Sequence, residues 1–137
     1  MAELPDPGVE IVATHFIVAA DVARSRSFYV DVLGGEAVVE GEPSIVRFAD
    51  TWIIINVGGG PTEDKPEVVL APPADPNHVD SFMNLRVGDI HALYERWRSR
   101  GAEFLTPPVQ RPTELRCFMR DPDGHLIEVG QWTRAPW

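Results

Sequence analysis

The sequence has only one cysteine, Cys117, among its 137 residues. A single cysteine excludes an internal disulfide and any zinc site built on several cysteines. No apolar run approaches the roughly 20 residues that span a bilayer, and residues 1–7 lack the basic and apolar regions of a signal peptide. We therefore expect a cytoplasmic protein, and the 44 % of its residues that are hydrophobic are enough to form an apolar core.

Positive charge is also scarce. Lys and Arg number 12 against 21 Asp and Glu, which gives a formal net charge of -9. Such a charge repels polyanions, and no basic run offers a local exception, so neither nucleic acid nor a membrane is an expected partner. The expected partner is a small molecule.

What the sequence does contain is one pattern twice. An extended run ends at Asp21, which can cap a helix over residues 22–33 that Gly34 stops. The second half repeats this order, with Asp89 as the cap and Gly101 as the stop. Extended segments follow each helix, at 37–40, 44–49 and 52–57 in the first half and at 103–105, 115–120 and 125–130 in the second. The pattern predicts a βαβββ unit repeated twice.

The two repeats define a first module over about residues 9–60 and a second over about residues 79–132. Residues 61–78 are rich in proline and acidic residues and form a connector, with a short strand expected at 67–70. One module cannot cover its sheet alone. The whole chain, residues 1–137, is therefore predicted to fold as a single α+β domain.

Two motifs carry a family resemblance that extends over residues 10–132. They are Asp21-Val-Ala-Arg-Ser-Arg-Ser-Phe-Tyr-Val-Asp-Val-Leu-Gly34 and Arg120-Asp-Pro-Asp-Gly-His-Leu-Ile-Glu128. Together they resemble the vicinal oxygen chelate superfamily, which includes glyoxalase I, fosfomycin- and bleomycin-resistance proteins and extradiol dioxygenases. The resemblance implies a cupped, eight-stranded mixed sheet with the helices outside, and often a homodimer. It leaves the chemistry open, since this fold carries both enzymes and non-catalytic binders.

Metal-using members of this superfamily place ligands on the first and last strands of each module. The resemblance carries these positions to Thr14, Asn56, Phe82 and Glu128. Zn, Ni, Fe and Mn sites usually take at least three imidazole or carboxylate ligands, so this set predicts that no metal is bound. His15 is the alternative ligand beside Glu128 if a shift in register turns it inward, whereas strand alternation places it between the sheet and the helices.

Strand alternation predicts which side chains lie on the inner face of the cup. These are Thr14, Phe16, Trp52, Ile54, Asn56, Phe82, Asn84, Arg86, Arg116, Phe118 and Glu128. Several aromatic rings with a few polar groups are typical of a small-molecule pocket. Plain core packing is the alternative for the rings, and for Trp52 in particular.

Two charged residues on this face have open roles. Arg116 either pairs with Glu128 or binds a carboxylate or phosphate of a ligand. Among aromatic rings, Glu128 is expected to have a raised pKa unless Arg116 or Asn56 stabilises its charge. It could then act as a general acid or base, or, when ionised, it could hold a cationic ligand.

Three functions fit these observations. The first is a metal-free protein of the bleomycin-resistance type that binds a small aromatic or cationic compound. The second is an enzyme of the glyoxalase, lyase, isomerase or dioxygenase kind. It would use acid–base chemistry at Glu128, or a divalent metal held by His15 and Glu128. The third is an accessory domain whose own side chains fill the cup.

Overall fold

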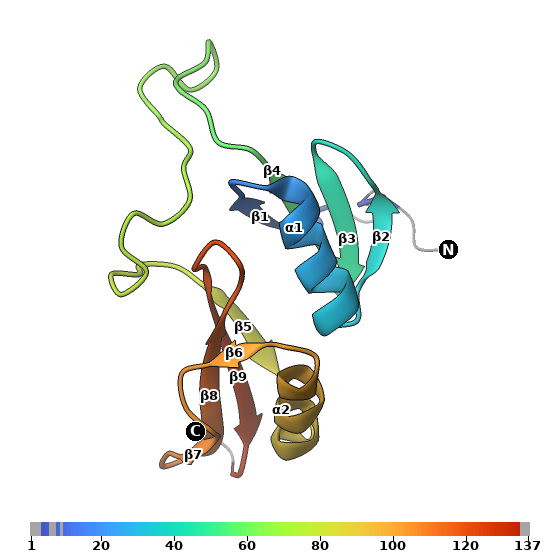
Figure 1. The fold of residues 1–137 in the computed structure, drawn as a ribbon, viewed down its shortest axis with the longest axis vertical. Helices are drawn as coiled ribbons and strands as arrows, with labels where there is room; N and C mark the ends of the chain where they lie inside the picture. Colours follow the sequence, from blue (N-terminus) through green and yellow to red (C-terminus); the bar gives the residue numbers. More distant parts are fainter. Residues whose placement is uncertain (1–3, 6–7, 9, 135–137) are drawn as a thin grey trace. The chain divides into compact units, whose positions relative to one another are not determined.

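The computed structural model describes residues 4–5, 8 and 10–134. The expectation about a signal peptide concerns residues 1–7, most of which lie outside the described residues. The chain forms two compact units, Met1–Ala74 and Asp75–Trp137, each with a sheet of its own (Figure 1). In the described part of the chain, no helix is long and apolar enough to cross a membrane.

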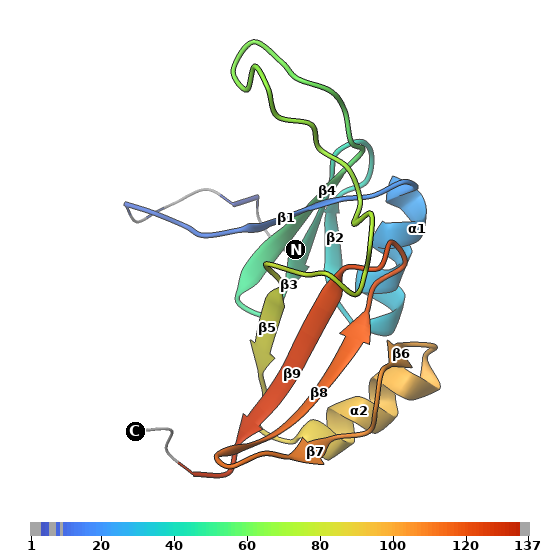
Figure 2. The ribbon, with the colours of Figure 1, turned by 90° about the vertical axis from the view of Figure 1, so that its left-hand side faces the viewer.

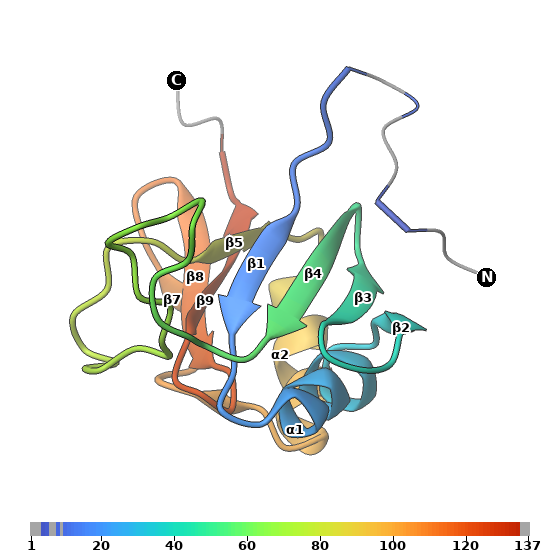
Figure 3. The same cartoon turned by 90° about the horizontal axis from the view of Figure 1, so that it is seen from above.

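The first unit is a βαβββ module. Its described strands are β1 (His15–Val18), β2 (Glu36–Val39), β3 (Ser44–Phe48) and β4 (Thr51–Asn56). They lie in the order β1-β4-β3-β2, which Figure 3 shows with α1 on one side of the sheet. β1 runs parallel to β4, and the other neighbours are antiparallel. The helical segments α1 (Val22–Ser27) and η1 (Phe28–Val32) connect β1 to β2.

The helix predicted over residues 22–33 changes its winding along its length. Its start is confirmed, because the Asp21 side chain accepts a hydrogen bond from the Arg24 backbone N–H at 3.0 Å. From Phe28 onward the turns widen into a π-helix, in which the Leu33 N–H donates to the Phe28 carbonyl at 3.2 Å. Gly34 ends the helix with a φ of 87°, as the sequence predicts.

The second unit repeats the plan (Figure 2). Its described strands are β5 (Met83–Arg86), β6 (Glu103–Phe104), β7 (Val109–Gln110), β8 (Glu114–Arg120) and β9 (Leu126–Trp132). The order is β5-β9-β8-β6, with β5 parallel to β9 and with β7 paired to β8. The helix α2 (Ile90–Ser99) is capped by Asp89, which accepts from the Ala92 N–H at 3.1 Å. Gly101 follows it with a φ of 104°.

These elements confirm the α+β class and the repeated βαβββ unit. The strand count differs from the predicted eight, because within the described residues the first sheet has four strands and the second has five. The fifth is β7, which pairs with β8 beside a proline-rich loop. The strand expected at residues 67–70 was wrong, since only Leu70 makes an isolated bridge, to Gly59. The single-domain organisation stays a prediction.

One face of each sheet is apolar and covered by the helix of its own unit. In the first unit, Val46, Ile53 and Ile55 on this face are fully buried. In the second unit, Met119 and Ile127 are buried in the same way. Alternation therefore leaves the opposite face of each sheet, here called the open face, to carry the predicted site residues.

Candidate functional site

The open face of the second sheet brings five of the predicted site residues together. Strand pairing places them in two adjacent rows across β5, β9 and β8. The rows are Asn84, Glu128 and Phe118, followed by Arg86, Gly130 and Arg116. Two carboxylates, two guanidinium groups and aromatic rings share this face, because Glu114 and Trp132 follow in the next row.

The Arg86 guanidinium makes both a hydrogen bond and a contact with an aromatic ring. Its Nη1 donates a hydrogen bond to Glu114 Oε1 at 3.1 Å, and its guanidinium carbon lies 3.8 Å from the centre of the Trp132 ring. Gly130 makes room for this arrangement. A Cβ at that position would lie 2.2 Å from Arg86 Nη1 and 2.7 Å from Glu114 Oε1. The missing side chain at Gly130 is thus what lets the ion pair lie flat on the sheet.

Arg116 is held much less firmly. Its Nε lies 3.9 Å from Glu128 Oε1, which is beyond hydrogen-bond distance, so the predicted pairing forms only loosely. Its guanidinium carbon is 5.6 Å from the centre of the Phe118 ring. The Arg116 side chain is 34 % exposed, whereas that of Glu128 is 11 % exposed. Arg116 is therefore the accessible member of the pair.

Glu128 is a buried carboxyl whose ionisation is disfavoured. Burial raises its pKa, and the negative charge of Glu114 raises it further, while Arg116 and Arg86 oppose the rise. The direction agrees with the sequence-based expectation. The contribution of Glu114 was not anticipated. Glu128 consequently holds its proton to a higher pH than an exposed glutamate does.

The aromatic rings of this face are not core residues. Phe82 is 41 % exposed and Trp132 is 46 % exposed. The rings of Phe82 and Phe118 meet edge to face, with their centres 6.1 Å apart. Plain core packing therefore does not explain the exposed rings of this face.

Glu114 and Trp132 were missed by the sequence analysis. The strands containing them were predicted over residues 115–120 and 125–130, and both extend further in the structure. Alternation along the longer strands would have found them, because Glu114 shares the parity of Arg116, and Trp132 that of Gly130.

The open face of the first sheet carries the remaining predicted residues. Phe16 is 48 % exposed and pairs in register with Ile54. Trp52 is half-buried under the Arg47 guanidinium, whose carbon lies 4.1 Å from the indole centre. Arg47 was also missed, although it pairs in register with Trp52. Trp52 thus stacks on a cation rather than inside an apolar core.

The positions implied for a metal do not make a good donor set. Thr14 is exposed just before β1, and Phe82 offers no ligating atom. Asn56 already uses its side-chain oxygen to accept from the Val57 N–H at 2.9 Å. Among the described residues there is no group of three or more His, Cys, Asp or Glu side chains that could hold a metal. The residues present therefore do not fit a divalent cation.

His15 keeps the parity that alternation gives it. It pairs in register with Ile53, so the two side chains share the face that α1 covers, and it is half-buried. The alternative in which His15 is a metal ligand would require the opposite face.

The predicted correspondence between Asn56 and Glu128 was wrong by two residues. Phe16 and Asn84 occupy equivalent positions before the capping aspartates, and they pair with Ile54 and Glu128. Ile54 is therefore the counterpart of Glu128. The turn between β3 and β4 is also tighter than the turn between β8 and β9, since Phe48 pairs with Thr51 whereas Arg120 pairs with Leu126. A shift of two leaves every side chain on its predicted face.

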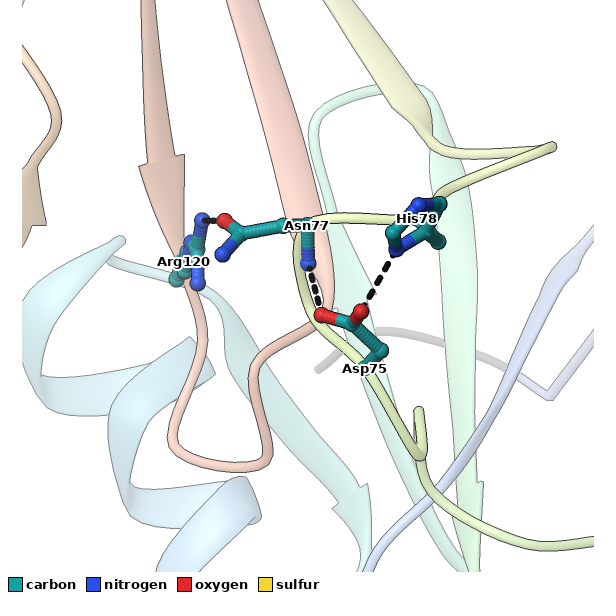
Figure 4. A network of polar contacts seen from close by, with 4 residues as sticks. All are labelled: Asp75, Asn77, His78 and Arg120. Atoms are coloured by element: carbon teal, nitrogen blue, oxygen red, sulfur yellow. Dashed lines mark hydrogen bonds and ion pairs between the residues drawn. The ribbon is translucent and has the colours of Figure 1, made fainter.

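A polar network holds the segment before β5 to the end of β8 (Figure 4). Asp75 accepts hydrogen bonds from the Asn77 backbone N–H at 3.0 Å and from the His78 ring. Arg120 Nη2 donates to the Asn77 side-chain oxygen at 2.6 Å. The His78 side chain is 87 % exposed. The network fixes this segment to the end of β8.

Comparison with known proteins gives the family of the chain. The Glyoxalase/Bleomycin resistance protein/Dioxygenase superfamily matches residues 11–129. Metallothiol transferase FosB of Shouchella clausii (strain KSM-K16) is 28 % identical over 120 residues, which cover 85 % of this chain and 76 % of that protein.

Two solved structures show the same fold at low sequence identity. A glyoxalase/bleomycin resistance protein/dioxygenase from Nocardioides has a TM-score of 0.72 and 20 % identity, with 94 % of this chain and 90 % of that chain covered. TnmS3, an antibiotic binding protein from Streptomyces sp. CB03234, has a TM-score of 0.63 and 20 % identity, with 91 % and 99 % covered. With the family match over most of its length, the chain belongs to the glyoxalase/bleomycin resistance protein/dioxygenase superfamily.

Proposed function

We propose that this protein binds a small molecule without a metal, in the manner of the bleomycin-resistance members, with the ligand on the open faces of the sheets. The observation that carries this proposal is the second open face, where exposed rings and a buried carboxyl share one side of the sheet. Phe82 and Trp132 offer apolar area, while Glu128 and Arg116 offer the few polar groups that orient a ligand. The name of TnmS3, an antibiotic binding protein, describes a protein of this kind.

The absence of a metal from the proposal rests on the donor set. Phe82 and Asn56 occupy two of the implied positions, and neither suits Zn, Ni, Fe or Mn. The relative FosB is named a metallothiol transferase, so its name refers to a metal. This chain would need to recruit His15 from the helix-covered face to build a comparable site.

A first experiment separates these possibilities by metal content. The untagged protein is incubated with Zn, Ni, Mn or Fe(II), desalted and analysed by elemental mass spectrometry. We expect less than stoichiometric retention of each metal. Retention of one metal ion per chain, lost in His15→Ala, would establish the alternative ligand set and overturn the metal-free proposal.

A second experiment tests the binding face with a neutral aromatic probe. Binding of 2-naphthol is followed by ligand-observed NMR and by intrinsic Trp fluorescence. We expect Phe118→Ala to weaken binding and Phe104→Ala to leave it unchanged, since Phe104 packs on Tyr94, away from this face. If 2-naphthol does not bind, or if both variants behave alike, the open face is not the binding site and an accessory-domain role gains support.

An acid–base enzyme is the second candidate, and the raised pKa of the buried Glu128 favours it. Such an enzyme would exchange an acidic C–H of a bound ligand for deuterium in D₂O. Exchange catalysed by the wild type and lost in Glu128→Gln, with binding retained, would support this role. A bound ligand that shows no exchange leaves Glu128 a binding group only.

We also propose that the protein acts in the cytoplasm, and that it forms a homodimer, as the family resemblance implies. Sedimentation equilibrium then gives twice the chain mass of 15.2 kDa. A mass of a single chain at micromolar concentration would overturn the dimer.

A further inference from the structure

The four charged groups on the second open face divide into a closed pair and a loose pair. Arg86 and Glu114 are hydrogen-bonded to each other at 3.1 Å, and the Trp132 ring lies against the guanidinium. Arg116 and Glu128 are 3.9 Å apart, and among the described residues the Arg116 guanidinium makes no hydrogen bond. The loose pair is therefore the one that a ligand can enter.

The two members of the loose pair are not equally accessible. Three times as large a fraction of the Arg116 side chain is exposed, at 34 % against 11 % for Glu128. A ligand that approaches this face consequently meets a guanidinium and the Phe118 ring before it reaches a carboxylate. The charged groups that face Glu128 come from both strands that flank β9, with Arg86 on β5 and with Glu114 and Arg116 on β8.

We propose that this face selects an aromatic carboxylate, an inference that rests on the proposed function. The carboxylate of the ligand pairs with Arg116, its ring lies against Phe118, and Glu128 takes up one proton from solvent as the ligand binds. No covalent bond forms. Proton uptake removes the repulsion between Glu128 and the incoming anion, and it leaves a carboxylic acid that can donate a hydrogen bond to that anion.

A cationic ligand fits the same geometry poorly. It would have to pass the Arg116 guanidinium to reach Glu128, and the like charge of Arg116 raises the free energy of such a complex. Arg86 and Glu114 neutralise each other in the closed pair, so Glu114 offers no free carboxylate to a cation.

The test uses three probes of one shape that differ in charge: 2-naphthoate, 2-naphthamide and 2-naphthamidine. Dissociation constants are measured by ligand-observed NMR titration at pH 6. We expect the carboxylate to bind about tenfold more tightly than the amide, the scale of one charge-assisted contact. Arg116→Gln removes this difference.

Arg98→Gln is the matched control for Arg116→Gln. Arg98 also lies 5.6 Å from a ring centre, that of Tyr94, and it has a loose ion pair with Glu95 at 3.7 Å. It sits on α2, away from the open face. We expect this variant to bind 2-naphthoate as the wild type does.

The effect of Glu128→Gln on affinity distinguishes an anion site from a cation site. At a cation site, loss of the carboxylate would weaken ligand binding. The variant keeps the size of the side chain and mimics the protonated acid, so we expect it to bind 2-naphthoate at least as tightly as the wild type. Calorimetry in two buffers of different ionisation enthalpy should show proton uptake with the wild type and none with the variant. Its melting temperature confirms that the variant is folded.

Each other outcome overturns the inference. Tightest binding of 2-naphthamidine, or weaker binding of 2-naphthoate by Glu128→Gln, would assign the face to cations. If 2-naphthol binds through Phe118 while the three probes bind alike, the proposed function stands and the charge class is wrong. If neither 2-naphthol nor any of the three probes binds, the proposed function fails as well.

Discussion

The two open faces differ, although the two sheets have the same strand order. On the first, Trp52 is stacked against Arg47, and Ile54 occupies the position that corresponds to Glu128. On the second, two arginines and two glutamates form one closed and one loose ion pair. The faces beneath the helices remain alike, since isoleucines at equivalent positions, Ile53 and Ile127, are buried in both.

The repeated unit determines the scaffold and the helix-covered faces, whereas the side chains of the open faces differ between the two units. Alternation allows this separation, because every second residue of a strand packs the core and the rest are free to vary. Of the two open faces, the second carries the arginine–glutamate ion pairs.

The largest effect should come from the shared core. Ile53→Ala and Ile127→Ala each remove a fully buried side chain, so each should lower the free energy of unfolding by about 2–5 kcal/mol. If the chain is a single domain, both variants shift one common transition in urea unfolding followed by Trp fluorescence. Ile11→Ala is the control, because Ile11 is 77 % exposed and its loss should cost less than about 0.5 kcal/mol. Two separate transitions would contradict the single-domain prediction.

Alanine substitutions at two glycines, one in each unit, should differ in how much stability they cost. A Cβ at Gly58 would lie 2.3 Å from the Leu70 carbonyl oxygen, which is backbone, so Gly58→Ala should cost about 1–3 kcal/mol in thermal unfolding. The three atoms nearest to a Cβ at Gly130 belong to the ends of the Arg86 and Glu114 side chains, which can move. Gly130→Ala should therefore cost less stability. Equal losses in the two variants would show that the Arg86–Glu114 pair cannot be displaced.

Much of this fold could be predicted from the sequence, because its determinants are local. Asp21 and Asp89 cap helices, Gly34 and Gly101 end them, and strand parity placed His15 on the face that α1 covers. Parity is a robust prediction, since an error of two residues in register leaves every side chain on its face.

The remaining features depend on contacts between strands that no local pattern encodes. The distinction between Arg86 and Arg116 depends on the space above Gly130, which is defined by three strands together. Glu114 and Trp132 lie in the last pair of β8 and β9, beyond the predicted strand ends. The sequence consequently identified Arg86, Arg116 and Glu128, but it identified neither Glu114 nor which arginine is held only loosely.

The helix caps should behave alike in the two units, in contrast to the open faces. Each aspartate accepts one hydrogen bond from the backbone three residues further on, so Asp21→Ala and Asp89→Ala should each cost about 1 kcal/mol of unfolding free energy. Asn replacements keep an accepting oxygen and should retain most of the stability. A clear difference between the two alanine variants would mean that the helices are not equivalent.

The smallest effects should be two pH dependences of opposite sign. The pKa of Glu128 is raised in the folded state, mainly by burial, so the folded state binds this proton more strongly than the unfolded chain. Its contribution to stability therefore falls as the pH rises from the unfolded pKa to the folded one. Glu128→Gln should abolish this fall in unfolding free energies measured between pH 4 and pH 8. An unchanged pH profile would contradict the raised pKa.

In the first unit, the pKa of Asp64 is lowered by the hydrogen bond from the Thr62 hydroxyl. Its contribution is present above the unfolded pKa and is lost as the pH falls through the folded one. Asp64→Asn should remove a small acid sensitivity below pH 4, measured by thermal melting. A variant that melts like the wild type at every pH would show that this exposed bond contributes nothing.

The π-helical turn explains how the halves can differ in length and still share a strand order. Gly34 lies thirteen positions after Asp21, whereas Gly101 lies twelve positions after Asp89. The wider turn over η1 takes up one extra residue through the bond from Leu33 to Phe28, five positions back. A single-residue insertion is thereby absorbed within the helix and never reaches the sheet. The helical layer of this fold can change length by one residue while the strands of the sheet keep their register.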